Sequence, residues 1–204
     1  MKKNFTRILS LCMALVMCFS LTAFASAAEV TSDGGSATSS VTLSSTADGS
    51  LNGDSAATAM SVTVPTVLPI AVGTDGTVTT AIDAKIINNS YGSVKVNSVT
   101  IDAARNWYLT AFGDKSTLAH EKVDSNKLGF ALAIGGGEQK ATTSKDSASQ
   151  QLLTAAIDGC TMSGVGDTAA NSVAIDYAAI VTPVSTAVTN TQVASVLFVI
   201  SWNK

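Results

Sequence analysis

Apolar and polar residues alternate with a period of two over most of the chain beyond residue 60. This alternation, rich in β-branched residues, is typical of strands that bury one face. The longest runs are Leu128–Ile134, Val173–Ala179 and Ala194–Trp202, and shorter ones occupy 61–64, 67–72, 77–82 and 84–88. We predict a strand in each of these ranges.

The last run differs from the others because both of its faces are apolar. Leu197 and Val199 stand opposite Val196, Phe198 and Ile200. Strands covered on both sides have such a composition. We therefore expect the final strand to lie in the centre of a sheet.

Local breaks in the alternation indicate bulges and turns. The apolar positions from Val94 to Ile101 change phase between Asn97 and Ser98, which predicts a β-bulge. The segment 73–76 ends in Asp75-Gly76, a strong hairpin signal. The stretch 150–157 is compatible with a short helix or a strand.

These elements predict an all-β fold, a single antiparallel β-sandwich or jelly roll, over residues 60–204. A domain of about 145 residues buries roughly 68–70 % of its unfolded surface, which is enough for a core without disulfides. Pro65 and Pro69 place the first strands at an edge or a bulge, because proline cannot donate to a ladder.

Residues 1–28 have the pattern of a secretory signal peptide. Lys2, Lys3 and Arg7 precede an apolar run that ends in small residues, and cleavage is expected at 25, 27 or 28. Two alternatives stay open: an uncleaved anchor, and a lipoprotein that begins at Cys18. The expected location is extracellular, secreted or associated with the cell surface.

Residues 29–59 predict a flexible, low-complexity leader, because they carry few large apolar side chains. Within the leader, the segment 40–45 alternates and contains Val41 and Leu43. These two residues make it a candidate donor strand, which pairs with its own domain or with a neighbouring subunit.

The net charge of the chain restricts which classes of binding partner we expect. The chain has 12 cations and 15 acids, and removal of three cations with the signal leaves nine, a net charge of −6. This balance argues against a nucleic-acid partner. No later apolar run approaches the roughly 20 residues that span a bilayer, so we expect no transmembrane segment in the mature chain.

Candidate catalytic and metal-binding residues are few. His120, the sole histidine, lies in a charged segment without ligand partners at zinc-site spacing. The segment 48–54 resembles half of a calcium loop, but Ala59 stands where the bidentate Glu belongs. Cys160 is the single cysteine after the signal. We expect no enzyme activity, no metal and no cofactor.

Two short motifs carry a family resemblance. Trp107-Tyr108-Leu109 is a Trp-X-Leu element, and a second apolar strand ends in Trp202. Residues 60–204 therefore resemble the WxL surface-protein domain of Gram-positive bacteria, with a looser likeness to camelysin/TasA-type matrix fibre subunits. Lys204 stands where the second motif would have Leu.

The resemblance implies a surface protein that binds the cell wall non-covalently. We expect a non-enzymatic structural protein that attaches to cell-wall polymer or assembles with like subunits into a homo-oligomer, matrix or filament. The alternative is a soluble carbohydrate-binding or adhesive module, in which exposed rings such as Tyr91 or Trp107 stack on sugars. A hydrolase with paired carboxylates is the third hypothesis.

Overall fold

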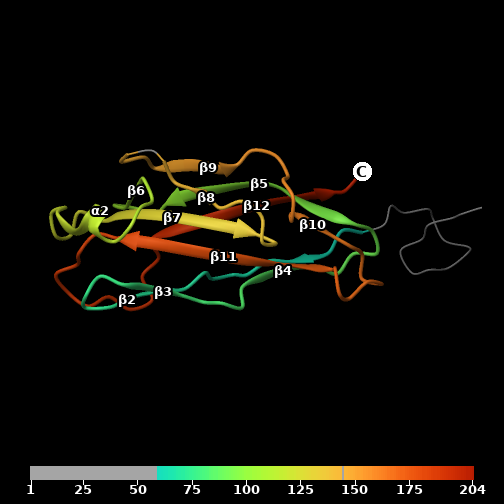
Figure 1. Cartoon of the computed structure of the whole chain (residues 1–204), viewed down its shortest axis with the longest axis horizontal. Coiled ribbons are helices and arrows are strands. Elements are labelled where there is room, and N and C mark those ends of the chain that lie inside the picture. Colours follow the sequence, from blue (N-terminus) through green and yellow to red (C-terminus); the bar gives the residue numbers. More distant parts are fainter. Residues whose placement is uncertain (1–58, 144) are drawn as a thin grey trace, which may run out of the picture. The chain divides into compact units, whose positions relative to one another are not determined.

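The computed structural model describes residues 59–143 and 145–204, and this part of the chain is all-β with predominantly antiparallel sheets (Figure 1). The core lies between two sheets that pack face to face. No helix in these ranges is long and apolar enough to cross a membrane. The predicted all-β sandwich is confirmed.

The large sheet has six strands, with β11 and β7 at its centre. Its path runs β1 (Val62–Thr63), β4 (Lys85–Asn88), β11 (Ser172–Val181), β7 (Lys127–Ile134) and β6 (Tyr108–Thr110). A further strand, β8 (Lys140–Ala141), pairs with β7. β11 and β7 share the longest register of this sheet, from Ile175↔Ile134 to Val181↔Leu128.

The small sheet is built around β5 (Val94–Ala103). On one side of β5 lie β10 (Thr161–Met162) and β9 (Ser149–Leu153), and on the other side lies β12 (Ala194–Trp202). β9 shows that the ambiguous stretch 150–157 begins as a strand. The register of β5 against β12 skips Asn97, so the predicted β-bulge is confirmed.

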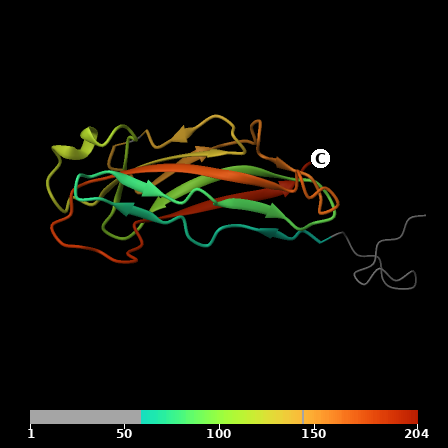
Figure 2. The same cartoon turned by 60° about the horizontal axis from the view of Figure 1, so that its bottom comes forward.

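A separate ribbon of two strands, β2 (Ile70–Val72) and β3 (Val78–Thr80), lies alongside β11 (Figure 2). The Tyr177 hydroxyl of β11 donates to the Pro69 carbonyl at 2.7 Å and accepts from the Ala81 amide at 3.1 Å. The turn uses Gly76 at φ +76°, and the Asp75 carboxylate accepts from the Thr77 amide and hydroxyl. The predicted hairpin is confirmed.

One strand pair departs from the predicted antiparallel pattern. β6 and β7 run parallel, with Tyr108↔Lys127 to Thr110↔Gly129 in register. The connection between them contains the short helix α2 (Ser116–Ala119). Parallel neighbours need such a crossover, because a tight turn would reverse the chain direction.

The position of the last strand overturns our expectation of a central strand. β12 pairs with β5 alone, so it is an edge strand. Leu197 and Val199 are 57% and 42% exposed, so its outer face is not covered. The strands with neighbours on both sides are β4, β11, β7 and β5.

Candidate functional site

The free edge of β12 is the most unusual surface of the described domain. β12 has nine residues, whereas the other strands that border the two main sheets have two to five. Figure 1 shows it running beside β5 towards the C-terminus. Within residues 59–143 and 145–204, no other strand pairs with β12. We call this unpaired side the β12 edge.

Hydrogen bonds at the two ends of β12 define which residues face the open side. The Ala104 amide donates to the Val193 carbonyl at 3.0 Å, and the Asn203 amide donates to the Ser93 carbonyl at 3.0 Å. Backbone groups of alternate residues in an antiparallel ladder point to opposite sides. The odd-numbered residues therefore face β5. The even-numbered residues direct N–H and C=O groups to the β12 edge: Ala194, Val196, Phe198, Ile200 and Trp202.

The bulge lies in β5 and leaves β12 regular. Val199 is paired with Ser98 and Ile200 with Val96, so the extra residue is Asn97. β12 is thus a continuous extended segment that presents its free backbone groups in one row. Such a row is a template for pairing with another strand.

Side chains on β12 divide into two faces. Val196, Phe198 and Ile200 pack against the core but remain only partly buried. Leu197 and Val199 lie on the outer face of the small sheet, opposite Thr100 and Ser98 of β5. Two exposed apolar side chains therefore stand next to polar ones, directly beside the β12 edge.

No charged residue and no proline interrupts β12. Natural proteins usually block long edge strands with Lys, Pro, a bulge or a covering loop, because open edges promote association. β12 contains no Lys and no Pro, and the bulge lies in β5 and not in β12. The β12 edge is therefore chemically suited to accept a strand.

The structure does not bring the two tryptophans of the resemblance together. Trp107 donates its backbone N–H to the Ala104 carbonyl, just beyond one end of β5, whereas Trp202 pairs with Val94 at the other end. Both tryptophans are partly buried against the core. Leu109 is fully buried in β6 and belongs to the core.

Four predicted features lie outside the described residues, which begin at residue 59. These are the signal peptide at 1–28, the flexible leader at 29–59 apart from its last residue, the candidate donor strand with Val41 and Leu43, and the calcium-like segment at 48–54. They remain predictions.

Tyr91 stands at the end of the sandwich, in the loop after β4. Its side chain is 85% exposed. The Asn88 side chain holds this loop, because its Nδ2 donates to the Gly92 and Ser163 carbonyls and its Oδ1 accepts from the Ser90 amide. Tyr91 is therefore an exposed ring on an ordered loop.

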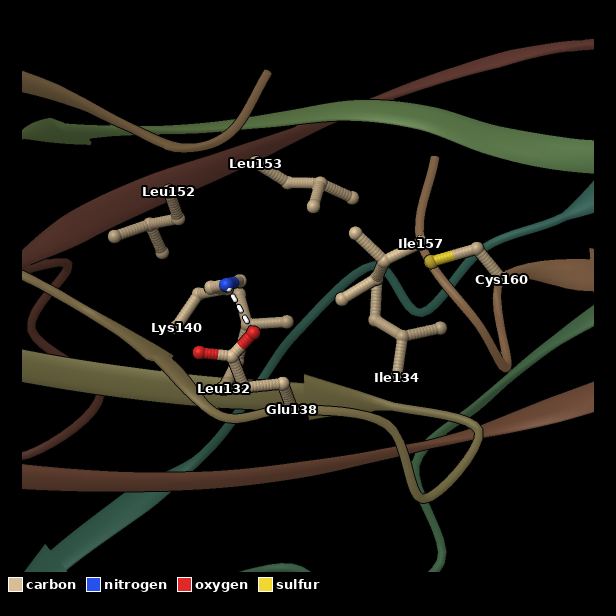
Figure 3. Close-up of a pocket in the computed structure, with 8 residues that line it drawn as sticks. All are labelled: Leu132, Ile134, Glu138, Lys140, Leu152, Leu153, Ile157 and Cys160. Carbon is tan, nitrogen blue, oxygen red and sulfur yellow. Dashed lines mark hydrogen bonds and ion pairs between the residues drawn. The ribbon is translucent and has the colours of Figure 1, made fainter. Parts of the chain in front are cut away.

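A small apolar cavity between the sheets adjoins Cys160 (Figure 3). Its volume of about 10 Å³ is at most room for a single water molecule. Glu138 and Lys140 form an ion pair of 2.6 Å beside it, and Cys160 is a buried free thiol. The cavity is too small for a substrate. Its lining is Leu132, Ile134, Glu138, Lys140, Leu152, Leu153, Ile157 and Cys160.

Ionisable groups with shifted pKa values stabilise local structure. The Ser116 hydroxyl and amide lower the pKa of Asp114, and those of Ser185 lower the pKa of Asp124. Hydrogen bonds from Lys127 to Glu121 and Asp146 raise the pKa of Lys127. These groups sit in turns and strand ends.

His120 is exposed at the end of α2. In the described ranges, no three residues among His, Cys, Asp and Glu are grouped so that they could hold a metal ion. The triple glycine 135–137 forms the β7–β8 turn, and a Cβ on Gly135 would lie 2.1 Å from the Gly159 carbonyl oxygen. This close backbone approach accounts for glycine at that position.

The β12 edge is not predicted from the sequence, although two signals point to it. The apolar outer face of β12 predicts burial within the domain, but it also fits a surface that another molecule covers. The lack of charge and proline across nine residues pointed the same way.

Comparisons of the chain with protein-family models, with curated proteins and with solved structures found no match.

Proposed function

We propose that this protein is a non-enzymatic, extracellular structural protein that associates with the cell surface, either by non-covalent attachment to wall polymer or by assembly with like subunits. One observation carries the proposal. The all-β domain exposes a long, uncharged edge strand with Leu197 and Val199 beside it. Strand addition at such an edge gives affinity through main-chain hydrogen bonds.

The sequence of residues 1–28 supports the extracellular part of the proposal. A positive segment, an apolar run and small residues are the features that direct export. An exported chain with an open β edge can add to a matrix or a wall-associated assembly after it leaves the cell. The resemblance to WxL-type and matrix-fibre proteins supports the same class of function.

Fractionation of cells that secrete the protein tests the proposal. We expect the mature chain to sediment with cell envelopes or filaments, and to be released by urea, which weakens apolar contacts and competes for peptide groups. Envelopes from cells that lack the protein, mixed with purified chain, serve as the binding control. A mature chain found entirely in the clarified medium, as a monomer, would contradict the proposal.

Tyr91 favours a second candidate function, a carbohydrate-binding or adhesive module. Its ring is 85% exposed on an ordered loop, as stacking on a sugar requires. Retention of the protein on a glycan panel tests this candidate, with Tyr91→Ala expected to lose retention. Tyr108→Ala is the matched control, because Tyr108 is also exposed, at 48%, and lies in β6. Equal retention of both variants would remove the candidate.

A further inference from the structure

We propose that the β12 edge is the interface of a two-fold symmetric dimer, in which β12 of a second copy of this chain pairs antiparallel with it and Phe198 stands opposite Phe198. This inference rests on the self-associating form of the proposed function.

The backbone phase of β12 fits this register. The even-numbered residues direct their N–H and C=O groups away from β5, as the hydrogen bonds at Val193 and Asn203 establish. Phe198 is the central residue of Ala194–Trp202 and is even-numbered. A two-fold axis at Phe198 therefore makes the central pair a hydrogen-bonded one and leaves no free backbone group unmatched along the strand.

The pattern of apolar and hydroxyl side chains in β12 is the same in both directions along the strand. The sequence is Ala-Ser-Val-Leu-Phe-Val-Ile-Ser-Trp. In the proposed register apolar residues meet apolar residues and serine meets serine. The pairs are Ala194 with Trp202, Ser195 with Ser201, Val196 with Ile200, Leu197 with Val199, and Phe198 with itself.

The register also explains the exposed apolar residues on the outer face. Leu197 and Val199 have polar neighbours on the β5 side, Thr100 and Ser98. Across the two-fold axis, Leu197 lies directly opposite the partner's Val199. The four side chains then form one apolar cluster, and directly opposed apolar pairs stabilise antiparallel sheets.

Charge does not oppose this pairing although the chain is acidic. β12 carries no charge, and in the same register Lys204 lies opposite Gln192 and Asn203 opposite Val193. The uncharged edge therefore allows two copies to approach without like charges facing each other.

The candidate donor strand fits the β12 edge less well. If that segment formed a strand, its alternation would place Val41 and Leu43 on one face and Ser40, Thr42 and Ser44 on the other. With Val41 and Leu43 turned towards the core, Leu197 and Val199 would meet only hydroxyl side chains. A second β12 supplies apolar residues on both faces.

Cysteine pairing between two variants tests the register. Leu197 and the partner's Val199 form a non-hydrogen-bonded pair, whose Cα atoms lie about 4.5 Å apart, within the range of a disulfide. We expect Leu197→Cys and Val199→Cys, mixed and mildly oxidised, to give a disulfide-linked dimer in non-reducing electrophoresis. Unsubstituted mature chain is the control, because Cys160 is fully buried.

Each cysteine variant alone should form little dimer. The two copies of residue 197 are diagonal neighbours, about 7–8 Å apart, which exceeds disulfide reach. Efficient cross-linking of either variant alone, or none in the mixture, would overturn the register.

A charge at the interface tests the dimer itself. Leu197→Lys should weaken dimerisation at least about tenfold in sedimentation equilibrium, because two lysines are then brought together beside the axis. Ile82→Lys is the matched control, since Ile82 is 96% exposed and lies in the connection between β3 and β4. A monomeric unsubstituted chain at millimolar concentration, or a dimer that Leu197→Lys leaves intact, would overturn the inference.

The leader segment is the competing occupant, and its variants distinguish it. A dimer lost in Val41→Lys with Leu43→Lys, and retained in Leu197→Lys, would assign the contact to that segment and overturn the inference. Failure of the dimer inference can be distinguished from failure of the proposed function. A monomer that still sediments with envelopes contradicts only the dimer, and a β12-linked dimer found wholly in the medium contradicts only the surface role.

Discussion

β11 and β12 are similar in length and lie in different sheets, but β11 is an inner strand whereas β12 is an edge strand. β11 pairs with β4 through Ser172–Ala174 on one side and with β7 through Ile175–Val181 on the other, and it buries Val173, Ile175 and Tyr177. β12 pairs on one side, and none of its residues is fully buried. The central strand nevertheless carries a charged residue, Asp176, whereas the edge strand carries none.

The difference shows that two-sided apolarity does not identify a central strand. Ala174 and Asp176 of β11 are exposed on the outer face of the large sheet, so a central strand can face solvent with part of its length. The apolar outer face of β12 therefore has no explanation in the isolated domain. It fits a surface that another molecule covers.

The largest expected effect is a loss of core packing in β11. Ile175 is 1% exposed, so Ile175→Ala should lower the unfolding free energy by about 2–5 kcal/mol through lost burial and a cavity. Leu197→Ala in β12 should change it by less than about 0.5 kcal/mol. Urea denaturation at protein concentrations too low for association measures both. Equal losses would show that Leu197 is covered within a single chain.

Amide hydrogen exchange should separate the two strands residue by residue. In dilute monomer, even-numbered amides of β12 should exchange at least about a hundredfold faster than its odd-numbered amides, because only the latter face β5. The even-numbered amides of β11 from Asp176 to Ile180, which face β7, should be slow. At high protein concentration, the proposed dimer should protect the even-numbered amides of β12 as well, so that the difference in exchange rate between even and odd positions disappears. Uniform protection of β12 in dilute protein would contradict an open edge.

A smaller effect is expected where β11 holds the β2–β3 ribbon. Tyr177→Phe removes the hydroxyl that bonds Pro69 and Ala81, which leaves two partly buried backbone groups unpaired. The unfolding free energy should fall by about 1–3 kcal/mol. Faster exchange of the Ala81 amide is the local readout, with Tyr108→Phe, which lies outside the ribbon, as control. An unchanged Ala81 amide would show that the ribbon is held by apolar packing alone.

The smallest effect concerns the turn of that ribbon. Hydrogen bonds from Thr77, and then from Lys115, lower the pKa of Asp75 from 3.8 to about 2. The ionised carboxylate therefore stabilises the folded turn above pH 4, and this contribution is lost as the pH falls towards 2. NMR titration of the Thr77 amide should show the midpoint near 2, and Asp75→Asn should abolish it. A midpoint near 3.8 would contradict the hydrogen-bonded turn.

Local features of the fold were predictable because they depend on neighbouring residues. The phase change at Asn97–Ser98 gave the bulge, and Asp75-Gly76 gave the hairpin turn. The placement of β12 was not predictable, since alternation does not reveal what covers a face. The parallel β6–β7 pair was missed for a related reason: a strand pattern has no direction.

The candidate site was predictable only in part. The residues of the last strand were identified correctly as a strand, but the open backbone row depends on which strands lie beside it. That information resides in contacts between distant segments, such as Val94 with Trp202. Two-residue strands such as β8 and β10 are too short to carry a periodic signal.

The pairing of β5 with β12 also sets the order of events when the chain folds. These strands lie about a hundred residues apart in the sequence, and β4 meets β11 across a gap nearly as long. Neither sheet can close until the C-terminal strands are available, and such non-local topologies fold slowly. A chain synthesised from its N-terminus would therefore complete its fold only after its last strand had been made.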